Sequence, residues 1–177
     1  MASKSKKKTL RSKIAWSDVK ALVLDCDGVL TTGELFYDET GRRMLAFHSR
    51  DGFGLGLLCR LGVRVGILSG RAVDIAEKRF SELGVHAFVG KCRDKKQGLL
   101  DMCRGLEVPA AQTVYVGDDI PDLEAFTVCG IRVAVADAAP EVLQAADYIT
   151  QKSGGRGAVR EVCELVLKAK GQWFVEK

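Results

Sequence analysis

Short, uninterrupted apolar runs alternate with amphipathic segments along most of this chain. Each run is too short for a helix, and a continuous apolar run of this length is typical of a strand buried on both faces. The expected strands cover residues 21–24, 63–68, 87–89, 113–116, 131–135 and 148–149. The expected helices cover residues 52–61, 73–83, 95–106, 123–128, 140–146 and 158–170. Strands that alternate with helices of about ten residues predict a doubly wound, Rossmann-like parallel sheet of the α/β class.

A different strand pattern follows the first apolar run. Residues 33–37 and 43–48 are β-prone and flank a Gly-containing turn at residues 38–41, which predicts a β-hairpin. The hairpin is inserted directly after the first strand, where a lid or an assembly surface would be placed. Two glycines, Gly54 and Gly56, weaken the helix that the next segment predicts.

Two aspartates mark the end of the first strand. Asp25 follows the apolar run, Asp27 comes two residues later, and Gly28 lets the backbone turn sharply. Two ionised carboxylates a few Å apart repel by about 1 to 4 kcal/mol, so such a pair needs a shared proton or a cation. An ordinary Asp-Gly turn with a spare aspartate is the structural alternative.

Other polar residues also fall where strands end. Ser69 follows the second strand, and Asp118 and Asp119 follow the fourth. The carboxyl ends of parallel strands share one edge, so these side chains should converge with Asp25 on one crevice. Carboxylate oxygens with little histidine nearby suit Mg²⁺, and Lys95 at the start of its helix adds a positive charge. Such a set predicts phosphoryl transfer, in which Asp25 attacks phosphorus and forms an aspartyl-phosphate.

Each of these features alone also has a structural interpretation. Ser69 and Gly70 can form a simple turn, Lys95 can be one of many exposed lysines, and residues 117–119 can be a loop with a helix cap. Their occurrence in order, each at a strand end or a helix start, favours the functional interpretation.

Composition limits the partners of the chain. Of 177 residues, 47% are hydrophobic and 28% are charged, which is ordinary for a soluble globular protein. The net charge of +4 arises in residues 1–16, a basic arm expected to be flexible, with binding to RNA or an anionic membrane as the alternative. Residues 17–177, expected to form a single domain, carry 21 basic and 23 acidic residues. We therefore expect no nucleic acid partner for this domain.

The cysteines and the hydropathy indicate the compartment. Six cysteines are scattered without a C-x-x-C pair, which argues against a zinc site or a disulfide framework and predicts reduced thiols. No apolar run approaches the roughly eighteen residues that span a bilayer, and the basic start lacks the apolar core of a secretory signal. We expect a cytoplasmic protein with no membrane partner.

In these residues the chain resembles the haloacid dehalogenase superfamily of phosphohydrolases. The four motifs of that superfamily are matched by residues 25–31, by Ser69, by a lysine and by residues 117–122. The resemblance implies that Asp25 is the nucleophile, and that Asp27 protonates the leaving oxygen and then activates water. It implies further that Ser69 and Lys95 hold the phosphoryl group.

The same resemblance implies a Mg²⁺ cofactor. The ligands would be the Asp25 carboxylate, the backbone carbonyl of Asp27, and Asp118. Asp119 would contact the metal through water or support its ligands, and Asp122 would orient the lysine or the loop.

The identity of the lysine is left open between two neighbours. Counting back from the end of the helix favours Lys95 over Lys96. The preceding loop, residues 90–94, is one residue longer than the motif leads us to expect, so both remain candidates.

A closer resemblance is to the capless branch of that superfamily that hydrolyses 3-deoxy-D-manno-octulosonate 8-phosphate (KDO 8-phosphate) to KDO and inorganic phosphate. The segments that carry it are residues 27–33, 50–52, 68–71, 117–122, 134–137 and 154–161. The resemblance implies a small-molecule sugar-acid phosphate as substrate and no cap domain. Arginines would bind the sugar-acid carboxylate, because guanidinium groups bind carboxylates bidentately. The expected substrate contacts are Thr31, Arg50, Asp51, Gly70, Arg71 and Arg156, with His48 as an additional candidate.

In that family the hairpins assemble a homotetramer, and the C-terminal tail of a neighbour helps to close the site. Phe36, Tyr37, Phe47 and Trp173 would then lie at interfaces between copies. Packing into the local core is the alternative for these four residues.

Three other functions are weighed against this one. The family also contains phosphatases of related nine-carbon sugar acids, from which the sequence does not separate this chain. A phospho-receiver signalling domain has clustered aspartates on a similar sheet, but places its acidic pair and its acceptor on different strands. An inactive binding scaffold is the third, although every residue type that the chemistry requires is present.

Overall fold

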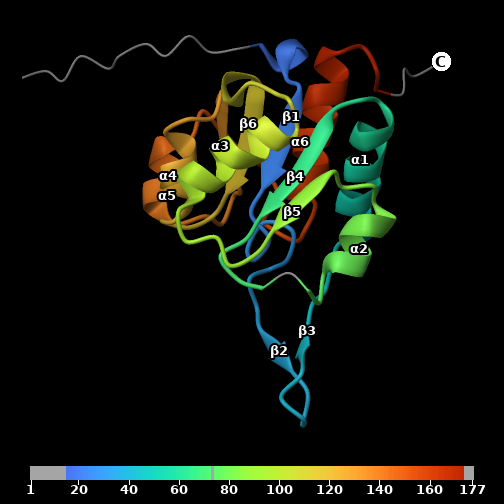
Figure 1. Cartoon of the computed structure of the whole chain (residues 1–177), viewed down its shortest axis with the longest axis vertical. Helices are drawn as coiled ribbons and strands as arrows, with labels where there is room; N and C mark the ends of the chain where they lie inside the picture. Colours follow the sequence, from blue (N-terminus) through green and yellow to red (C-terminus); the bar gives the residue numbers. More distant parts are fainter. Residues whose placement is uncertain (1–14, 73, 174–177) are drawn as a thin grey trace, which may run out of the picture.

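The computed structural model describes residues 15–72 and 74–173. Six parallel strands form one sheet in the order β5-β4-β1-β6-β7-β8 (Figure 1). The strands are β1 (Ala21–Leu24), β4 (Arg64–Leu68), β5 (Ala87–Val89), β6 (Thr113–Gly117), β7 (Ile131–Ala134) and β8 (Tyr148–Ile149). The doubly wound α/β sheet predicted from the sequence is confirmed.

Strand β1 lies in the middle of this sheet. It pairs with β4 on one side and with β6 on the other, so that Leu24 lies opposite Ile67 and Val116. All four residues of β1 are buried, because helices cover both faces, which explains the uninterrupted apolar run. The chain reverses its direction of winding between β1 and β6, and such a switch point is where open α/β sheets bind ligands.

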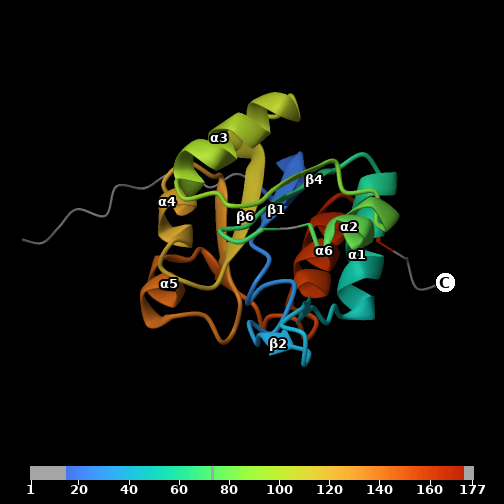
Figure 2. The same ribbon diagram turned by 60° about the horizontal axis from the view of Figure 1, so that its bottom comes forward.

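Helices cover the two faces of the sheet (Figures 1 and 2). The helices α1 (Ser49–Arg60), α2 (Glu77–Glu82) and α6 (Ala158–Ala169) lie on one face. The helices α3 (Lys95–Gly105), α4 (Asp122–Phe126) and α5 (Pro140–Ala145) lie on the other. Two short 3-10 turns, η1 (Trp16–Asp18) and η2 (Ala110–Gln112), precede β1 and β6. Helix α2 starts later than the sequence predicts because residues 74–76 form turns.

The glycines of α1 allow close packing against α6. A Cβ atom at Gly54 would lie 3.0 Å from Cys163 Cβ, so this position admits nothing larger without displacing α6. Asp51 links the same two helices, since its carboxylate accepts the backbone N–H groups of Gly157 (3.2 Å) and Arg160 (2.7 Å). A carboxylate at this place also suits the positive end of the α6 dipole.

The predicted hairpin is present and extends away from the carboxyl end of the sheet (Figure 1). Strands β2 (Phe36–Tyr37) and β3 (Arg43–Met44) form a separate two-stranded antiparallel sheet. No cap domain is inserted within the described part of the chain, as expected. The side chains of Phe36 and Tyr37 are 46% and 57% exposed, whereas Phe47 packs edge-on against Phe80 in the body.

The described chain has a tryptophan near each of its ends, Trp16 and Trp173. The basic residues of the expected arm, 1–14, lie outside the described residues. Trp16, at the end of that expected arm, packs edge-on against Tyr148 with ring centroids 5.8 Å apart. The Arg160 guanidinium lies over the Trp173 ring, and its Cζ atom is 4.7 Å from the centroid of that ring. Among the described residues no helix has the length and apolar content that crossing a bilayer requires.

Candidate active site

The loop after β1 carries the two aspartates at the sheet edge. Asp25 is buried, and its backbone N–H donates to the Val116 carbonyl at 3.0 Å, which extends the β1–β6 pairing by one residue. Gly28 has a φ of +87°, and a Cβ atom there would collide with the Asp118 carboxylate. The loop therefore requires glycine both for its backbone conformation and for its approach to β6.

Thr31 closes the same loop from within. Its Oγ1 atom accepts the N–H groups of Gly28 (3.4 Å) and Gly33 (3.3 Å) and donates to the Cys26 carbonyl. Thr31 is buried, so its hydroxyl shapes the loop. The hydrogen bonds of Thr31 are to the backbone of its own loop, and its predicted contact with the substrate stays a prediction.

Lys95, at the start of α3, connects the loop after β1 to the start of α4. Its Nζ atom lies 3.0 Å from Asp25 Oδ1 and 2.6 Å from Asp122 Oδ1, and all three side chains are almost fully buried. The pKa of Lys95 is raised because these two carboxylates outweigh the cost of burying its charge. Lys96 is exposed whereas Lys95 is buried, so the structure places Lys95 and not Lys96 against Asp25.

Asp122 uses both of its oxygens in hydrogen bonds. Oδ1 accepts from Lys95 and from the Tyr115 hydroxyl at 2.8 Å. Oδ2 accepts from the backbone N–H groups of Asp118 (2.9 Å) and Asp119 (3.2 Å). Through these bonds Asp122 contacts both Lys95 and the backbone of the loop after β6.

Carboxylate oxygens of Asp25, Asp118 and Asp122 lie within 4.8 Å of one another. Because Asp122 is already satisfied by four donors, Asp25 and Asp118 are the two carboxylates able to bind a cation. Asp118 Oδ1 and Asp27 Oδ1 are buried and accept no hydrogen bond within the described residues. Buried acceptors without donors, in an all-oxygen set, fit a hard divalent cation such as Mg²⁺.

Burial and mutual repulsion raise the pKa values of Asp25 and Asp118. Burial, reinforced by the Asp122 charge and opposed by Lys95, raises the pKa of Asp25 to about 6. Burial together with the charges of Asp122 and Asp25 raises the pKa of Asp118 to about 8. A cation in the cluster would replace these protons.

The turn after β4 contributes Gly70 and Arg71 to the lining of the hollow beside Asp25, whereas Ser69 is not among the lining residues. Ser69 is buried, and its Oγ atom accepts the Arg71 N–H at 3.1 Å, which forms a tight turn through Gly70. Arg71 Nε lies 3.5 Å from Asp27 Oδ2. The expected hydroxyl therefore lies at the expected sheet edge.

One hollow of about 460 Å³ brings most of the expected residues together. Its lining includes Asp25, Asp27, Gly70, Arg71, Lys95, Asp118, Asp119 and Asp122. Asp119 is exposed and its Oδ1 atom accepts the N–H of Ile120 at 2.8 Å. Gly33, Cys92, Arg93 and Pro121 complete the lining.

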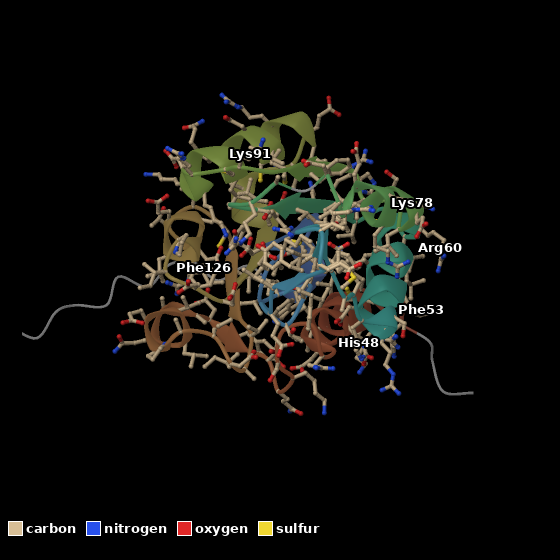
Figure 3. All side chains as sticks on the ribbon, turned by 90° about the horizontal axis from the view of Figure 1, so that it is seen from below. His48, Phe53, Arg60, Lys78, Lys91 and Phe126 are labelled. Atoms are coloured by element: carbon tan, nitrogen blue, oxygen red, sulfur yellow. The ribbon has the colours of Figure 1, made fainter. Side chains whose placement is uncertain are left out.

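Four other candidates lie outside the lining of this hollow. His48, Arg50 and Arg156 line a second hollow of about 620 Å³ that shares no lining residue with the first. Seen from the carboxyl end of the strands, Lys91 of the 90–94 loop and His48 lie on different sides of the molecule (Figure 3). Asp51 is buried at the α6 N-terminus, and burial raises the pKa of its carboxyl.

Two residues beside the predicted set, Tyr115 and Arg93, could not be singled out from the sequence pattern. Tyr115 belongs to the buried apolar strand β6. The sequence pattern does not distinguish a tyrosine that hydrogen-bonds to a site residue from a tyrosine that only packs in the core. Arg93 lies in the loop after a strand end, and a charged residue at that place was the available signal.

Comparison with known proteins provides an independent test. A family model described as haloacid dehalogenase-like hydrolase matches residues 75–162. The chain is 40% identical over 155 residues to 3-deoxy-D-manno-octulosonate 8-phosphate phosphatase of Haemophilus influenzae, covering 88% of this chain and 86% of that protein. The crystal structure of the Yersinia pestis phosphatase of the same name gives a TM-score of 0.86 at 36% identity, covering 89% of this chain and 85% of that one.

A further solved structure contains ligands. It is the phosphatase of the same name from Moraxella catarrhalis, in complex with a magnesium ion, a phosphate ion and KDO. Its TM-score is 0.86 at 35% identity, with 89% of this chain and 91% of that chain covered. The sequence likeness extends over nearly the whole of both chains, and the folds agree. The chain therefore belongs to the 3-deoxy-D-manno-octulosonate 8-phosphate phosphatases, a family of haloacid dehalogenase-like hydrolases.

Proposed function

We propose that this chain is a Mg²⁺-dependent phosphomonoesterase that hydrolyses KDO 8-phosphate to KDO and inorganic phosphate. One observation supports the chemistry above all others: Lys95 joins Asp25 to Asp122 at the sheet edge, with the Asp118 carboxylate alongside. A lone acidic turn would not include a buried lysine held between two carboxylates. Membership of the family supports the choice of substrate.

In the first step the Asp25 carboxylate attacks the phosphorus atom. A bond forms between an Asp25 oxygen and phosphorus, and the bond from phosphorus to the sugar C8 oxygen breaks. Asp27 donates a proton to that oxygen, so that neutral KDO hydroxyl leaves rather than an alkoxide. Lys95 fixes the rotation of the Asp25 carboxylate through the 3.0 Å contact at Oδ1.

In the second step water attacks the aspartyl-phosphate. Asp27, now ionised, accepts a proton from the water as its oxygen bonds to phosphorus, and the bond to Asp25 breaks. Phosphate is released and both aspartates return to their starting states. Ser69 and the backbone N–H of Gly70 hold the phosphoryl oxygens during both steps.

The proposed cofactor is Mg²⁺, held by the Asp25 and Asp118 carboxylates and the Asp27 carbonyl. When bound, it offsets the charge of the carboxylates and polarises the phosphoryl group. Asp119 acts from the exposed side of this cluster through water, and Asp122 keeps Lys95 and the β6 loop in position.

We propose also that the active form is a homotetramer in the cytoplasm. The exposed apolar side chains of the hairpin support assembly, and six cysteines scattered without a C-x-x-C pair suit a reducing compartment. Arg50 and Arg156, with His48 and Asp51 beside them, would then meet the substrate of a neighbouring copy, because they line a hollow separate from the catalytic one of their own chain.

The test is phosphate release from KDO 8-phosphate with Mg²⁺ and with a chelator. We expect wild-type turnover to require the metal, and Asp25→Asn to lower kcat by at least about a thousandfold, because the amide is not a nucleophile. Asp101→Asn makes the same chemical change on the exposed face of α3 and should leave kcat unchanged. Full activity of Asp25→Asn, or no release by the wild type from any sugar-acid phosphate, would contradict the proposal.

A further inference from the structure

The proposed substrate carries negative charge at both ends. KDO 8-phosphate is an octulosonate, so its carboxylate is at C1 and its phosphate at C8. When the phosphate lies against Asp25, the carboxylate must point along the hollow towards its mouth. A group that binds this carboxylate therefore belongs to the rim of the catalytic hollow, and this reasoning rests on the proposed function.

Two arginines are available in the lining of that hollow, Arg71 and Arg93. Arg71 faces a carboxylate of its own chain, with Nε 3.5 Å from Asp27 Oδ2. Arg93 is exposed and forms no salt bridge with any acidic residue in the described part of the chain. Of the two guanidinium groups, Arg93 is the one left free to bind an anion from solution.

The loop that carries Arg93 is held at both ends. The Lys91 N–H donates to the Arg71 carbonyl at 2.9 Å, and the Cys92 N–H donates to the Ser69 carbonyl at 3.0 Å. On the other side, Asp94 caps helix α3 by accepting the Gln97 N–H at 2.8 Å. The nearest acid in sequence is thus turned towards the helix, and the loop is tied to the turn that would hold the phosphoryl group.

The charges that line the hollow favour Arg93 as the group that binds the substrate carboxylate. Its lining contains five aspartates and three basic residues, namely Asp25, Asp27, Asp118, Asp119, Asp122, Arg71, Arg93 and Lys95. A divalent cation would bring this set to neutrality, and Lys95 is already held between two aspartates. A substrate with a phosphate and a carboxylate then adds further negative charge, and Arg93 is the basic residue of this set that has no carboxylate partner among the described residues.

We propose that Arg93 binds the carboxylate of the sugar acid and so contributes to the preference for sugar-acid phosphates over other phosphomonoesters. The guanidinium forms a bidentate, charge-assisted pair with the carboxylate, worth more than a neutral hydrogen bond in a partly enclosed hollow. Arg93 takes no part in the transfer of phosphorus and acts through substrate binding alone.

The test compares two substrates, KDO 8-phosphate and para-nitrophenyl phosphate, which has no carboxylate. For Arg93→Gln we expect the ratio of kcat/KM between the two substrates to fall by about ten- to a hundredfold, mainly through a higher KM for KDO 8-phosphate. Arg93→Lys should lie in between, because the charge stays while the bidentate geometry is lost. The inhibition constant of free KDO should rise in parallel.

Lys96→Gln is the matched control, since it removes a positive charge from an exposed residue nearby that does not line the hollow. Its substrate ratio should equal that of the wild type. If Arg93→Gln keeps the wild-type ratio, the carboxylate is bound elsewhere, for example by Arg50 or Arg156 of another copy, and the inference is wrong. If the wild type hydrolyses para-nitrophenyl phosphate but not KDO 8-phosphate, the proposed substrate fails instead.

Discussion

Asp122 illustrates how one buried side chain can organise several others. Its two oxygens accept from Lys95, from Tyr115 and from two backbone N–H groups of the loop after β6. Burying a carboxylate is costly unless it is paired and fully hydrogen-bonded, and here all of these conditions hold. The arrangement leaves Asp122 free of any direct role with the substrate and makes it the support of residues that have one.

Tyr115 tests this support. Tyr115→Phe removes one donor from Asp122 Oδ1 without changing the shape of the core, so Lys95 becomes the only side chain bound to that oxygen. We expect the Lys95 amine to shift from Asp25 towards Asp122, with a fall in kcat of about tenfold and a KM for KDO 8-phosphate within about twofold of wild type. Steady-state kinetics measures both constants.

Tyr148→Phe provides the comparison. It removes a hydroxyl that donates to Glu161 at 2.7 Å, which is a similar tyrosine–carboxylate bond outside the catalytic hollow. We expect Tyr148→Phe to lose about as much thermal stability as Tyr115→Phe but to keep the wild-type kcat. That result would show that the lower kcat of Tyr115→Phe comes from its effect on Lys95 and not from the loss of a hydrogen bond in general. Equal kcat values for the two variants would show that Tyr115 has only a structural part.

At this scale the sequence predicted residue types better than partners. The acidic pair after β1 and the hydroxyl after β4 follow from strand ends, which a single sequence shows. The contact between Lys95 and Asp122 joins two helices, and no local pattern encodes it. The choice between Lys95 and Lys96 depended on a loop of unexpected length, in which Lys91 adopts a left-handed conformation with a φ of 56°.

Among the elements, the hairpin β2–β3 is the one whose stability and exposed apolar side chains are not explained by packing against the main sheet and its helices. Its two strands have two residues each, and an isolated hairpin of this size is not stable in water on its own. Arg43 Nη2 donates to the Ala72 carbonyl at 3.4 Å, which ties β3 to the loop after β4. Phe36 and Tyr37 nevertheless remain exposed, as a surface for another copy would be.

We expect Phe36→Asp to weaken the proposed tetramer, because it places a charge in an apolar contact. Light scattering should give a mass of four chains for the wild type and a mass approaching the single-chain value of 19.2 kDa for the variant. Phe53→Asp is the matched control, since Phe36 and Phe53 are both 46% exposed and Phe53 lies on α1. A wild type that is monomeric, or a Phe36→Asp protein of unchanged mass, would contradict the tetramer.

Element types were predictable because apolar runs and helical spacing are local signals. All six strands of the main sheet and the hairpin lie where the sequence places them, within a few residues. The start of α2 was not predictable, since turn geometry at residues 74–76 competes with helical spacing. The glycines of α1 lower its helix propensity, yet Gly54 is needed for contact with α6, which propensity alone does not reveal.

At the scale of the whole molecule, the site concentrates negative charge at one end of the sheet. The pKa values of about 6 for Asp25 and about 8 for Asp118 lie above the 3.8 of an unperturbed aspartate. Between the unperturbed pKa of 3.8 and the raised pKa of about 8, the folded, metal-free protein binds more protons than the unfolded chain. The free energy of unfolding therefore falls as pH rises through this range.

Mg²⁺ should reverse this trend by replacing the protons. We expect the rise in melting temperature on adding Mg²⁺ to be larger at about pH 8 than at about pH 5. At a metal concentration about one hundred times the dissociation constant, about 2.7 kcal/mol of stabilisation corresponds to roughly 5 to 10 °C for a chain of this size. Thermal unfolding followed by circular dichroism, in Mg²⁺ and in a chelator, measures the shift.

Asp118→Asn serves as the control for this measurement. It removes a metal ligand and a charged group together, so the variant should respond little to Mg²⁺ at either pH. A wild-type shift that is equal at both pH values would show that metal binding and proton release are not linked in this cluster.

The central position of β1 has a consequence for synthesis on the ribosome. β1 emerges early, but one of its two neighbours, β6, is made only after β4 and β5 have been completed. Until then the nascent polypeptide carries a fully apolar strand with one open side, which is a binding motif for chaperones. The same order means that a prematurely terminated product lacking β6 has neither Asp118 nor Asp122 and leaves that open side permanently exposed.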